Sequence, residues 1–106
     1  MMKKFVGLCA CTMGLAHTFM AAEAIEKAAK NHGYEVKIET QGSDGIKNEL
    51  TMEDIDNADV ILLSTAVTPE NMERFEGYEI YEIPLSEAIK RADEVIEEIE
   101  EDQANS

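Results

Sequence analysis

The feature that most constrains the fold is an alternation of strand-like and helix-like segments along the chain. Short apolar, β-rich runs occur at residues 3–9, 34–40, 59–64 and 78–83, and helical patterns occur at 18–32, 51–57, 68–75 and from 86 onward. Such alternation is typical of an α/β domain with a mainly parallel sheet. Because parallel strands are joined by right-handed crossovers, we expect a small three-layer sandwich. Its Rossmann-like, four-stranded parallel sheet should have the strand order 2-1-3-4, with helices on both faces.

Local signals indicate where these segments begin and end. The apolar face of the first helix is predicted from residues three and four apart, namely Phe19, Ala22, Ile25, Ala28 and Ala29. Residues 41–45, which contain two glycines, are interpreted as a loop. Thr51 and Asp54 have the spacing of a capping box at the second helix. Pro69 stands at the first position of the third helix, which proline favours.

The length and composition predict one domain. With 106 residues, of which 44% are hydrophobic, the chain can bury a core without disulfides or metals. Residues 100–106 are acidic and polar, and we expect them to form a frayed, solvated tail.

The charge excludes several classes of function. The chain has 23 acidic and 9 basic residues, a net charge of −14. A nucleic-acid binder needs a basic face, and so does a helix that lies on an anionic membrane, so this charge argues against both functions. The sequence contains no stretch of about 18 apolar residues, which a helix that spans a bilayer needs. The short basic and apolar start is interpreted as a strand rather than an export signal. Two cysteines one residue apart cannot join distant segments, so we expect a cytoplasmic protein.

The loop after the first predicted strand is the candidate site, since ligands bind beyond the carboxyl ends of parallel strands. The N-terminus of the helix that follows favours anions and a thiolate. Gly14 allows the chain to turn so that successive N–H groups converge. Thr18 can cap the helix and bind an oxyanion, and His17 can donate to a phosphate.

Each of these residues also has a purely structural interpretation. Cys9 lies inside the strand and is expected to be a small buried hydrophobe. Cys11 taken alone is as compatible with a structural role as with a chemical one, and His17 alone is typical of a surface or capping position. No second Cys/His cluster supplies further ligands, so we predict no metal site.

The whole string from Cys11 to Ala22 closely resembles the phosphocysteine loop of the fructose family of phosphotransferase system (PTS) enzyme IIB components. That loop typically reads Cys-Pro-Thr-Gly, an aliphatic residue, then Ala-His-Thr and Met-Ala. The resemblance continues at residues 39–43, Gly45, Asn48, 50–51, 53–55, 58–59 and 74–75. It covers nearly the whole chain, so residues 1–106 are interpreted as a single, free-standing EIIB domain of the fructose-like type (type 2).

The resemblance implies a protein-N(pi)-phosphohistidine–sugar phosphotransferase component that carries a phosphoryl group during sugar uptake. Cys11 would accept this group from a phosphohistidine of the IIA component and donate it to a fructose-like sugar in the membrane component IIC. The phosphate-binding loop would comprise Thr12, Met13, Gly14, Leu15, Ala16, His17 and Thr18. The resemblance implies no cofactor. It implies a cytoplasmic protein that reaches the inner face of the membrane transiently through IIC.

Three positions depart from the family pattern. Thr12 replaces the proline and restores a backbone N–H, while Met13 replaces a threonine and removes a hydroxyl near the phosphate. Ala66 stands where the family usually has an aspartate after the third strand. The carrier chemistry is expected to survive these changes.

Two other functions remain open from the sequence. Cys11 followed after five residues by His17-Thr18 imitates a phosphatase loop, but it lacks the bidentate arginine, and Asp44 is the nearest candidate acid. The alternative is a regulator that docks to IIA or a transcription factor and reports phosphorylation. The net charge suits docking on the Lys/Arg-enriched face of a membrane protein, or serves only solubility.

Overall fold

A computed structural model describes residues 3–10, 15–42, 45–66, 69 and 71–105. Its elements, in chain order, are β1 (Lys3–Ala10), α1 (Leu15–Asn31), β2 (Tyr34–Gly42), β3 (Gly45–Lys47), α2 (Met52–Asp56), β4 (Val60–Thr65), the 3-10 helix η1 (Met72–Phe75), β5 (Tyr81–Pro84) and α3 (Leu85–Ala104). Among the described residues, no helix is both long and apolar enough to cross a membrane.

The sheet has five strands in the order β3-β2-β1-β4-β5. Four of them, β2, β1, β4 and β5, are parallel neighbours, so the α/β class and the predicted order of the parallel strands are confirmed. The predicted number of strands was one too few, because β3 adds to the edge antiparallel to β2. The sequence gives little sign of β3, since it has only three residues and starts at Gly45, whose φ is +106°.

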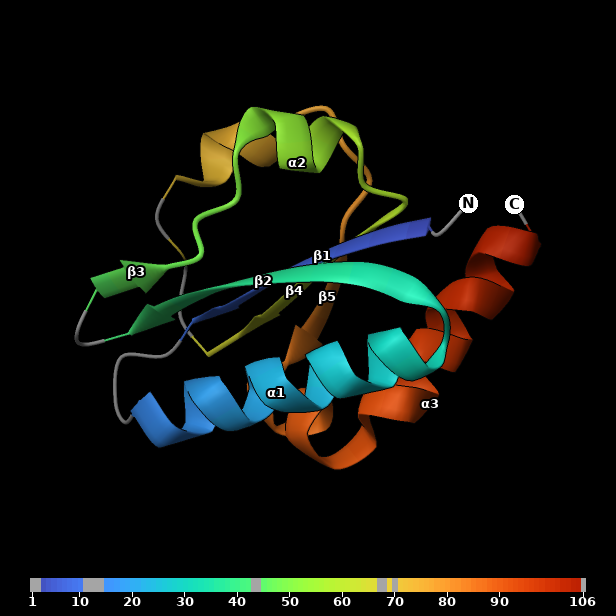
Figure 1. Cartoon of the computed structure of the whole chain (residues 1–106), viewed down its shortest axis with the longest axis horizontal. Coiled ribbons are helices and arrows are strands. Elements are labelled where there is room, and N and C mark those ends of the chain that lie inside the picture. The colour runs from blue at the N-terminus through green and yellow to red at the C-terminus, as the bar shows by residue number, and fades with distance from the viewer. Residues whose placement is uncertain (1–2, 11–14, 43–44, 67–68, 70, 106) are drawn as a thin grey trace.

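Helices lie on both faces of the sheet, which confirms the three layers. Helices α1 and α3 cover one face, and α2 and η1 cover the other (Figure 1). The strands alternate between the two cores: Phe5 and Cys9 face α1 and α3, while Val6, Leu8 and Ala10 belong to the core under α2 and η1.

Helix α1 begins at Leu15, three residues earlier than predicted, and Ile25, Ala28 and Ala29 of its predicted apolar face are buried, whereas Phe19 and Ala22 are not. Its buried residues are Thr18, Ala21, Ile25, Ala28 and Ala29. Phe19, which was predicted to face the core, is 39% exposed.

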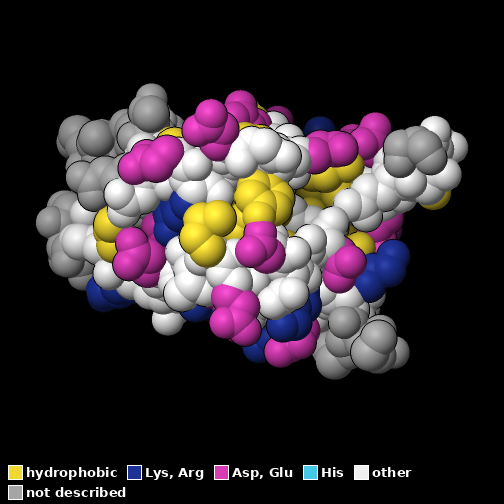
Figure 2. Space-filling view, turned by 90° about the horizontal axis from the view of Figure 1, so that it is seen from above, with side chains coloured by type: hydrophobic (Ala, Val, Ile, Leu, Met, Phe, Trp, Pro, Cys, Tyr) yellow, Lys and Arg dark blue, Asp and Glu magenta, His cyan; other side chains and the backbone are white. Residues whose placement is uncertain are grey.

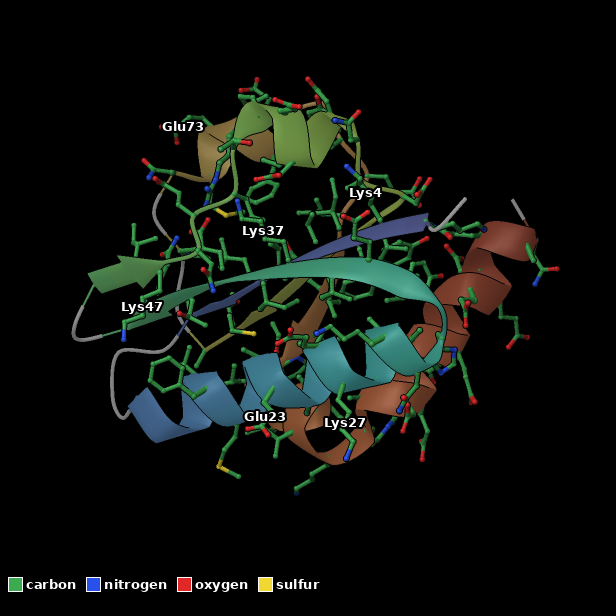
Figure 3. The ribbon with its side chains drawn as sticks, viewed as in Figure 1. Lys4, Glu23, Lys27, Lys37, Lys47 and Glu73 are labelled. Atoms are coloured by element: carbon green, nitrogen blue, oxygen red, sulfur yellow. The ribbon has the colours of Figure 1, made fainter. Side chains whose placement is uncertain are left out.

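The predicted capping box of α2 is confirmed. Thr51 Oγ1 accepts a hydrogen bond from Asp54 N–H, and an Asp54 carboxylate oxygen accepts one from Thr51 N–H. Asp54 also accepts from Lys37 Nζ at 2.7 Å, which joins β2 to α2 (Figure 3). These hydrogen bonds, that of Lys37 first, lower the pKa of Asp54 to about 2. Of the third predicted helix, residues 72–75 form η1, and Thr68 and Glu70 lie outside the described residues.

Helix α3 continues to Ala104, whereas a frayed end from residue 100 was expected. The side chains of its last turns explain the difference. Glu100 lies 2.9 Å from His32 Nδ1 and accepts a hydrogen bond from Tyr34 OH at 3.1 Å. Gln103 Nε2 donates to the Asp59 carbonyl at 2.9 Å. The acidic end of the helix is therefore tied to the rest of the domain.

Candidate functional site

The candidate site lies at the carboxyl edge of the sheet. The last residue of β1, Ala10, stands between Gln41 of β2 and Thr65 of β4, and its carbonyl accepts a hydrogen bond from Ala66 N–H at 2.9 Å. The next described residue is Leu15, at the start of α1. Residues 11–14 therefore connect a central strand end to a helix N-terminus.

The structure does not describe all of the predicted site residues. Cys11, Thr12, Met13 and Gly14 lie outside the described residues. The backbone of Leu15, Ala16 and His17 forms the first turn of α1, and their side chains are also outside the description. The first N–H groups of a helix have no intrahelical acceptor, and the helix dipole is positive at this end. The backbone at the start of α1 is thus suited to bind an anion.

Two buried hydroxyl groups near the start of α1 and the end of β4 have no hydrogen-bond partner among the described residues. Thr18 is 1% exposed and Ser64 is 0% exposed, and within the described part of the chain neither hydroxyl oxygen makes a hydrogen bond. Thr18 lies on the buried face of α1. Ser64 pairs in register with Cys9 and is two residues after Leu62, so its side chain lies on the same face of the sheet as theirs. It therefore also lies in the layer between α1 and the sheet. An unpaired buried hydroxyl costs about 1–3 kcal/mol, which a ligand oxygen can offset.

These positions correct one prediction and add a residue. Thr18 cannot cap the helix, because it is the fourth residue of α1 rather than the residue before it. Ser64 was not predicted as a site residue. Its only signal was a polar residue directly after the apolar run at positions 60–63.

The other cysteine near the loop, Cys9, is a core residue, as predicted. It is 0% exposed and belongs to the core between α1, α3 and the sheet. Burial raises the pKa of Cys9 to about 12. Its thiol is therefore neutral near pH 7 and inaccessible, so Cys9 is not a nucleophile for a partner's phosphoryl group.

A buried ion pair fixes the neighbouring end of β2. Arg74 Nη1 and Nη2 each donate to a different oxygen of Glu39 at 2.7 Å. Glu39 is fully buried, and it also accepts hydrogen bonds from Gln41 Nε2 and Leu50 N–H, both at 2.7 Å. Burial raises the pKa of Glu39, but the hydrogen bonds from Arg74, Gln41 and Leu50 outweigh burial and lower it. The pair holds η1 and residue 50 against β2.

The β2–β3 hairpin lies against the start of α1. Lys47 extends from β3 towards this helix, and its Nζ lies 5.0 Å from the centre of the Phe19 ring (Figure 3). Asp44, the acid that a phosphatase would use, lies outside the described residues.

Known proteins share both this sequence and this fold. A family model described as "PTS system, Lactose/Cellobiose specific IIB subunit" matches residues 6–98. The chain is 63% identical over 101 residues to the PTS system fructose-like EIIB component 1 of Escherichia coli, covering 95% of this chain and 94% of that protein. It is 50% identical over 99 residues to the fructose-like EIIB component 2, covering 93% of each. The chain belongs to the fructose-like family of PTS EIIB components.

Solved structures agree with this assignment of the EIIB chain. The solution structure of the enzyme IIB subunit of the PTS from Escherichia coli has a TM-score of 0.94 and 62% identity, covering 99% of this chain and 97% of that one. A domain of the fructose-specific IIABC component from Borrelia burgdorferi has a TM-score of 0.87 and 42% identity, covering 92% and 93%. The EIIB chain is therefore a phosphoryl-transfer component of a fructose-like PTS, that is, a sugar phosphotransferase component. The family model and the relatives carry different sugar names, so membership shows the reaction class rather than the sugar.

Proposed function

We propose that Cys11 carries the phosphoryl group, receiving it from IIA and passing it to a fructose-like sugar held by IIC. In the first step the Cys11 thiolate attacks phosphorus, an S–P bond forms and the N–P bond of the phosphohistidine breaks, leaving the electron pair on the imidazole nitrogen. In the second step a sugar hydroxyl attacks, an O–P bond forms and the Cys11 thiolate leaves. The hydroxyl proton passes to solvent water.

The observation that carries this proposal is the position of residues 11–14. They join the end of β1 to the N-terminus of α1, at the carboxyl edge where parallel sheets bind ligands. Cys9, two residues earlier, is buried and has a raised pKa, which leaves Cys11 as the cysteine in the loop. The positive end of α1 favours a thiolate and, after transfer, the phosphate.

The phosphate oxygens would be bound chiefly by backbone groups. The proposed loop comprises Thr12, Met13, Gly14, Leu15, Ala16, His17 and Thr18. Its N–H groups can point at one anion when they converge before a helix start. The unpaired Thr18 hydroxyl supports this proposal, because it is a buried donor next to the first turn of α1.

The helix field serves both steps. A free thiol has a pKa of about 8.5, and lowering it to about 6 takes roughly 3.4 kcal/mol of preferential stabilisation of the thiolate. The same stabilisation makes the thiolate a better leaving group towards the sugar. Phosphoryl transfer has a loose, in-line transition state, so positioning and charge neutralisation supply most of the catalysis.

The partners follow from this role. IIA is the proposed donor and the membrane component IIC carries the proposed acceptor sugar. We propose that the protein works in the cytoplasm and reaches the inner face of the membrane through IIC. Its charge of −14 supports such an approach, since cytoplasmic loops of membrane proteins are enriched in Lys and Arg.

Intact-mass spectrometry tests the proposal. The protein is incubated with phosphoenolpyruvate, the general phosphotransferase proteins and a fructose-type IIA. We expect a gain of about 80 Da, the mass of one phosphoryl group. The gain should disappear in Cys11→Ser and persist in Cys9→Ala, the matched control. Persistence in Cys11→Ser would contradict the proposal. Steady hydrolysis of a phosphate monoester by the wild type would favour a phosphatase instead.

A further inference from the structure

An apolar groove borders the candidate site on the side of α1 and α3. It has a volume of about 570 Å³. Its lining residues come from α1, the ends of β4 and β5, and the start of α3: Met20, Thr65, Ala66, Pro84, Leu85, Ser86, Ile89 and Lys90. Met20 is 51% exposed, so about half of this large apolar side chain is open to a partner at the groove.

Two of the residues that line the groove are close to the described residues on either side of the proposed phosphoryl site. Ala66, in its wall, donates its N–H to the carbonyl of Ala10, the residue directly before Cys11. Met20, which lines the groove from α1, is two residues after Thr18. A protein that presents a phosphoryl group to residue 11 would therefore cover the groove as well.

The charge of the groove differs from that of the chain as a whole. The chain has 23 acidic residues and a net charge of −14, yet among the residues that the structure describes none of the eight that line the groove is acidic, and Lys90 is basic. By contrast, acidic side chains are spread over the α2 face, around a small hydrophobic area (Figure 2). An anionic partner would meet less repulsion at the groove than at the α2 face.

We propose that this groove is the docking site for the phosphorylated IIA partner, which places an apolar side chain between Met20 and Ile89 while its phosphohistidine faces Cys11. The inference rests on the proposed function. It selects IIA rather than IIC by charge: the donor arrives with a phosphoryl group of about −2, whereas the cytoplasmic face of a membrane protein is enriched in Lys and Arg. A groove whose described lining residues carry no carboxylate suits the phosphorylated donor.

A matched pair of methionines tests the apolar part of the site. Met20 is 51% exposed and Met52, on α2 on the other face of the sheet, is 49% exposed. Binding is measured by calorimetry with IIA that has been phosphorylated through the general phosphotransferase proteins. All chains carry Cys11→Ser so that the partner keeps its phosphoryl group. Met20→Glu should raise Kd at least about tenfold, as expected for an apolar anchor, and Met52→Glu less than about twofold.

A second pair tests the charge. Lys90→Glu places a carboxylate on the groove and should raise Kd for phosphorylated IIA about threefold to tenfold, with a smaller effect at high salt. Lys3→Glu makes the same change of charge at the opposite end of β1, where Lys3 is exposed. It should leave Kd within about twofold of the starting value, because salt screens a charge that lies far from the groove.

The outcomes separate this inference from the proposed function. Binding that is insensitive to Met20→Glu overturns the groove as the IIA site, even if Cys11 is phosphorylated normally. Absence of any binding by the parent chain overturns it too. Weakened binding in Met20→Glu supports the groove even if the mass experiment fails to find phosphocysteine. If Met20→Glu leaves IIA binding intact but slows transfer from the phosphorylated, Cys11-containing chain to sugar in IIC vesicles, the groove serves IIC and the inference is wrong.

Discussion

The buried pair of Glu39 and Arg74 gives the sharpest test of what holds the site together. Arg74→Met keeps the length and the apolar stem of the side chain but removes three hydrogen bonds, two to Glu39 and one to the Leu50 carbonyl. It leaves a carboxylate that is 0% exposed and that, among the described residues, keeps Gln41 and Leu50 as its donors. Breaking one partner of a buried pair costs about 3–5 kcal/mol. Because a domain of this size has about 5–15 kcal/mol in total, the loss is measurable by urea denaturation.

The pH dependence of the lost stability tests whether the uncompensated charge of Glu39 causes it. In the wild type the folded-state pKa of Glu39 lies below its ordinary value of 4.5, so the ionised pair stabilises the fold above pH 4.5 and that contribution is lost as pH falls through the folded pKa. In Arg74→Met the remaining hydrogen bonds no longer outweigh the effect of burial on Glu39, so its pKa should rise above 4.5. The folded variant then binds more protons than the unfolded chain, so the gap to the wild type should narrow from pH 7 to about pH 5.

Two further variants complete this prediction. Adding Glu39→Gln to Arg74→Met removes the uncompensated charge and should restore part of the lost stability at pH 7. Arg91→Met is the control, because Arg91 is 39% exposed and pairs only with carboxylates that are themselves largely exposed on α3. It should cost less than about 1 kcal/mol. A gap that stays constant with pH, or a double variant less stable than Arg74→Met, would refute the reasoning.

Three other variants test the structure elsewhere. Thr18→Val removes a buried hydroxyl without a partner, so the free energy of unfolding should stay within about 1 kcal/mol or rise, while phosphorylation by IIA slows at least about tenfold if the hydroxyl binds the phosphate. Gly7→Ala would put a methyl carbon 2.8 Å from Ile38 Cδ1, the far end of a flexible side chain that can shift, so it should cost less than about 1 kcal/mol, and Ile38→Val in the same chain should remove that cost. Glu100→Ala should cost about 1 kcal/mol through its contacts with His32 and Tyr34, whereas the exposed Glu97→Ala should change stability by less than about 0.5 kcal/mol; equal effects would contradict the docked end of α3.

The parallel strands could be predicted because each is a continuous apolar or alternating run bounded by turn residues. The run at positions 60–63 is buried on both sides, as its sequence indicates. The face of α1 could not be predicted with the same certainty, because Ala21 and Ala22 are equally apolar and occupy adjacent positions. Packing decides between them, and it buries Ala21 while leaving Phe19 at the surface.

The sequence leads to a proposed place for the site, but the contacts that surround that place could not be predicted. The rule that ligands bind at the carboxyl ends of parallel strands locates the loop after β1 from sequence alone. By contrast, Arg74 and Glu39 are 35 residues apart and no local pattern pairs them. Ser64 likewise became a candidate site residue only once the structure placed it in register with Cys9, with a buried hydroxyl that has no partner among the described residues.

The anchoring of the residues on either side of the loop bears on how the proposed carrier would serve its two proposed partners. Ala10 and Thr18, the residues on either side of the segment 11–17, are each 1% exposed. The Ala66 to Ala10 hydrogen bond holds the first end, and the packing of α1 on the sheet holds the second. When the backbone donors of a site are fixed by the scaffold, little reorganisation is needed at the moment of transfer. Such anchoring would let the same set of N–H groups bind the phosphoryl group on arrival from IIA and on departure to the sugar. A change that loosens either anchor should therefore slow both steps by similar factors.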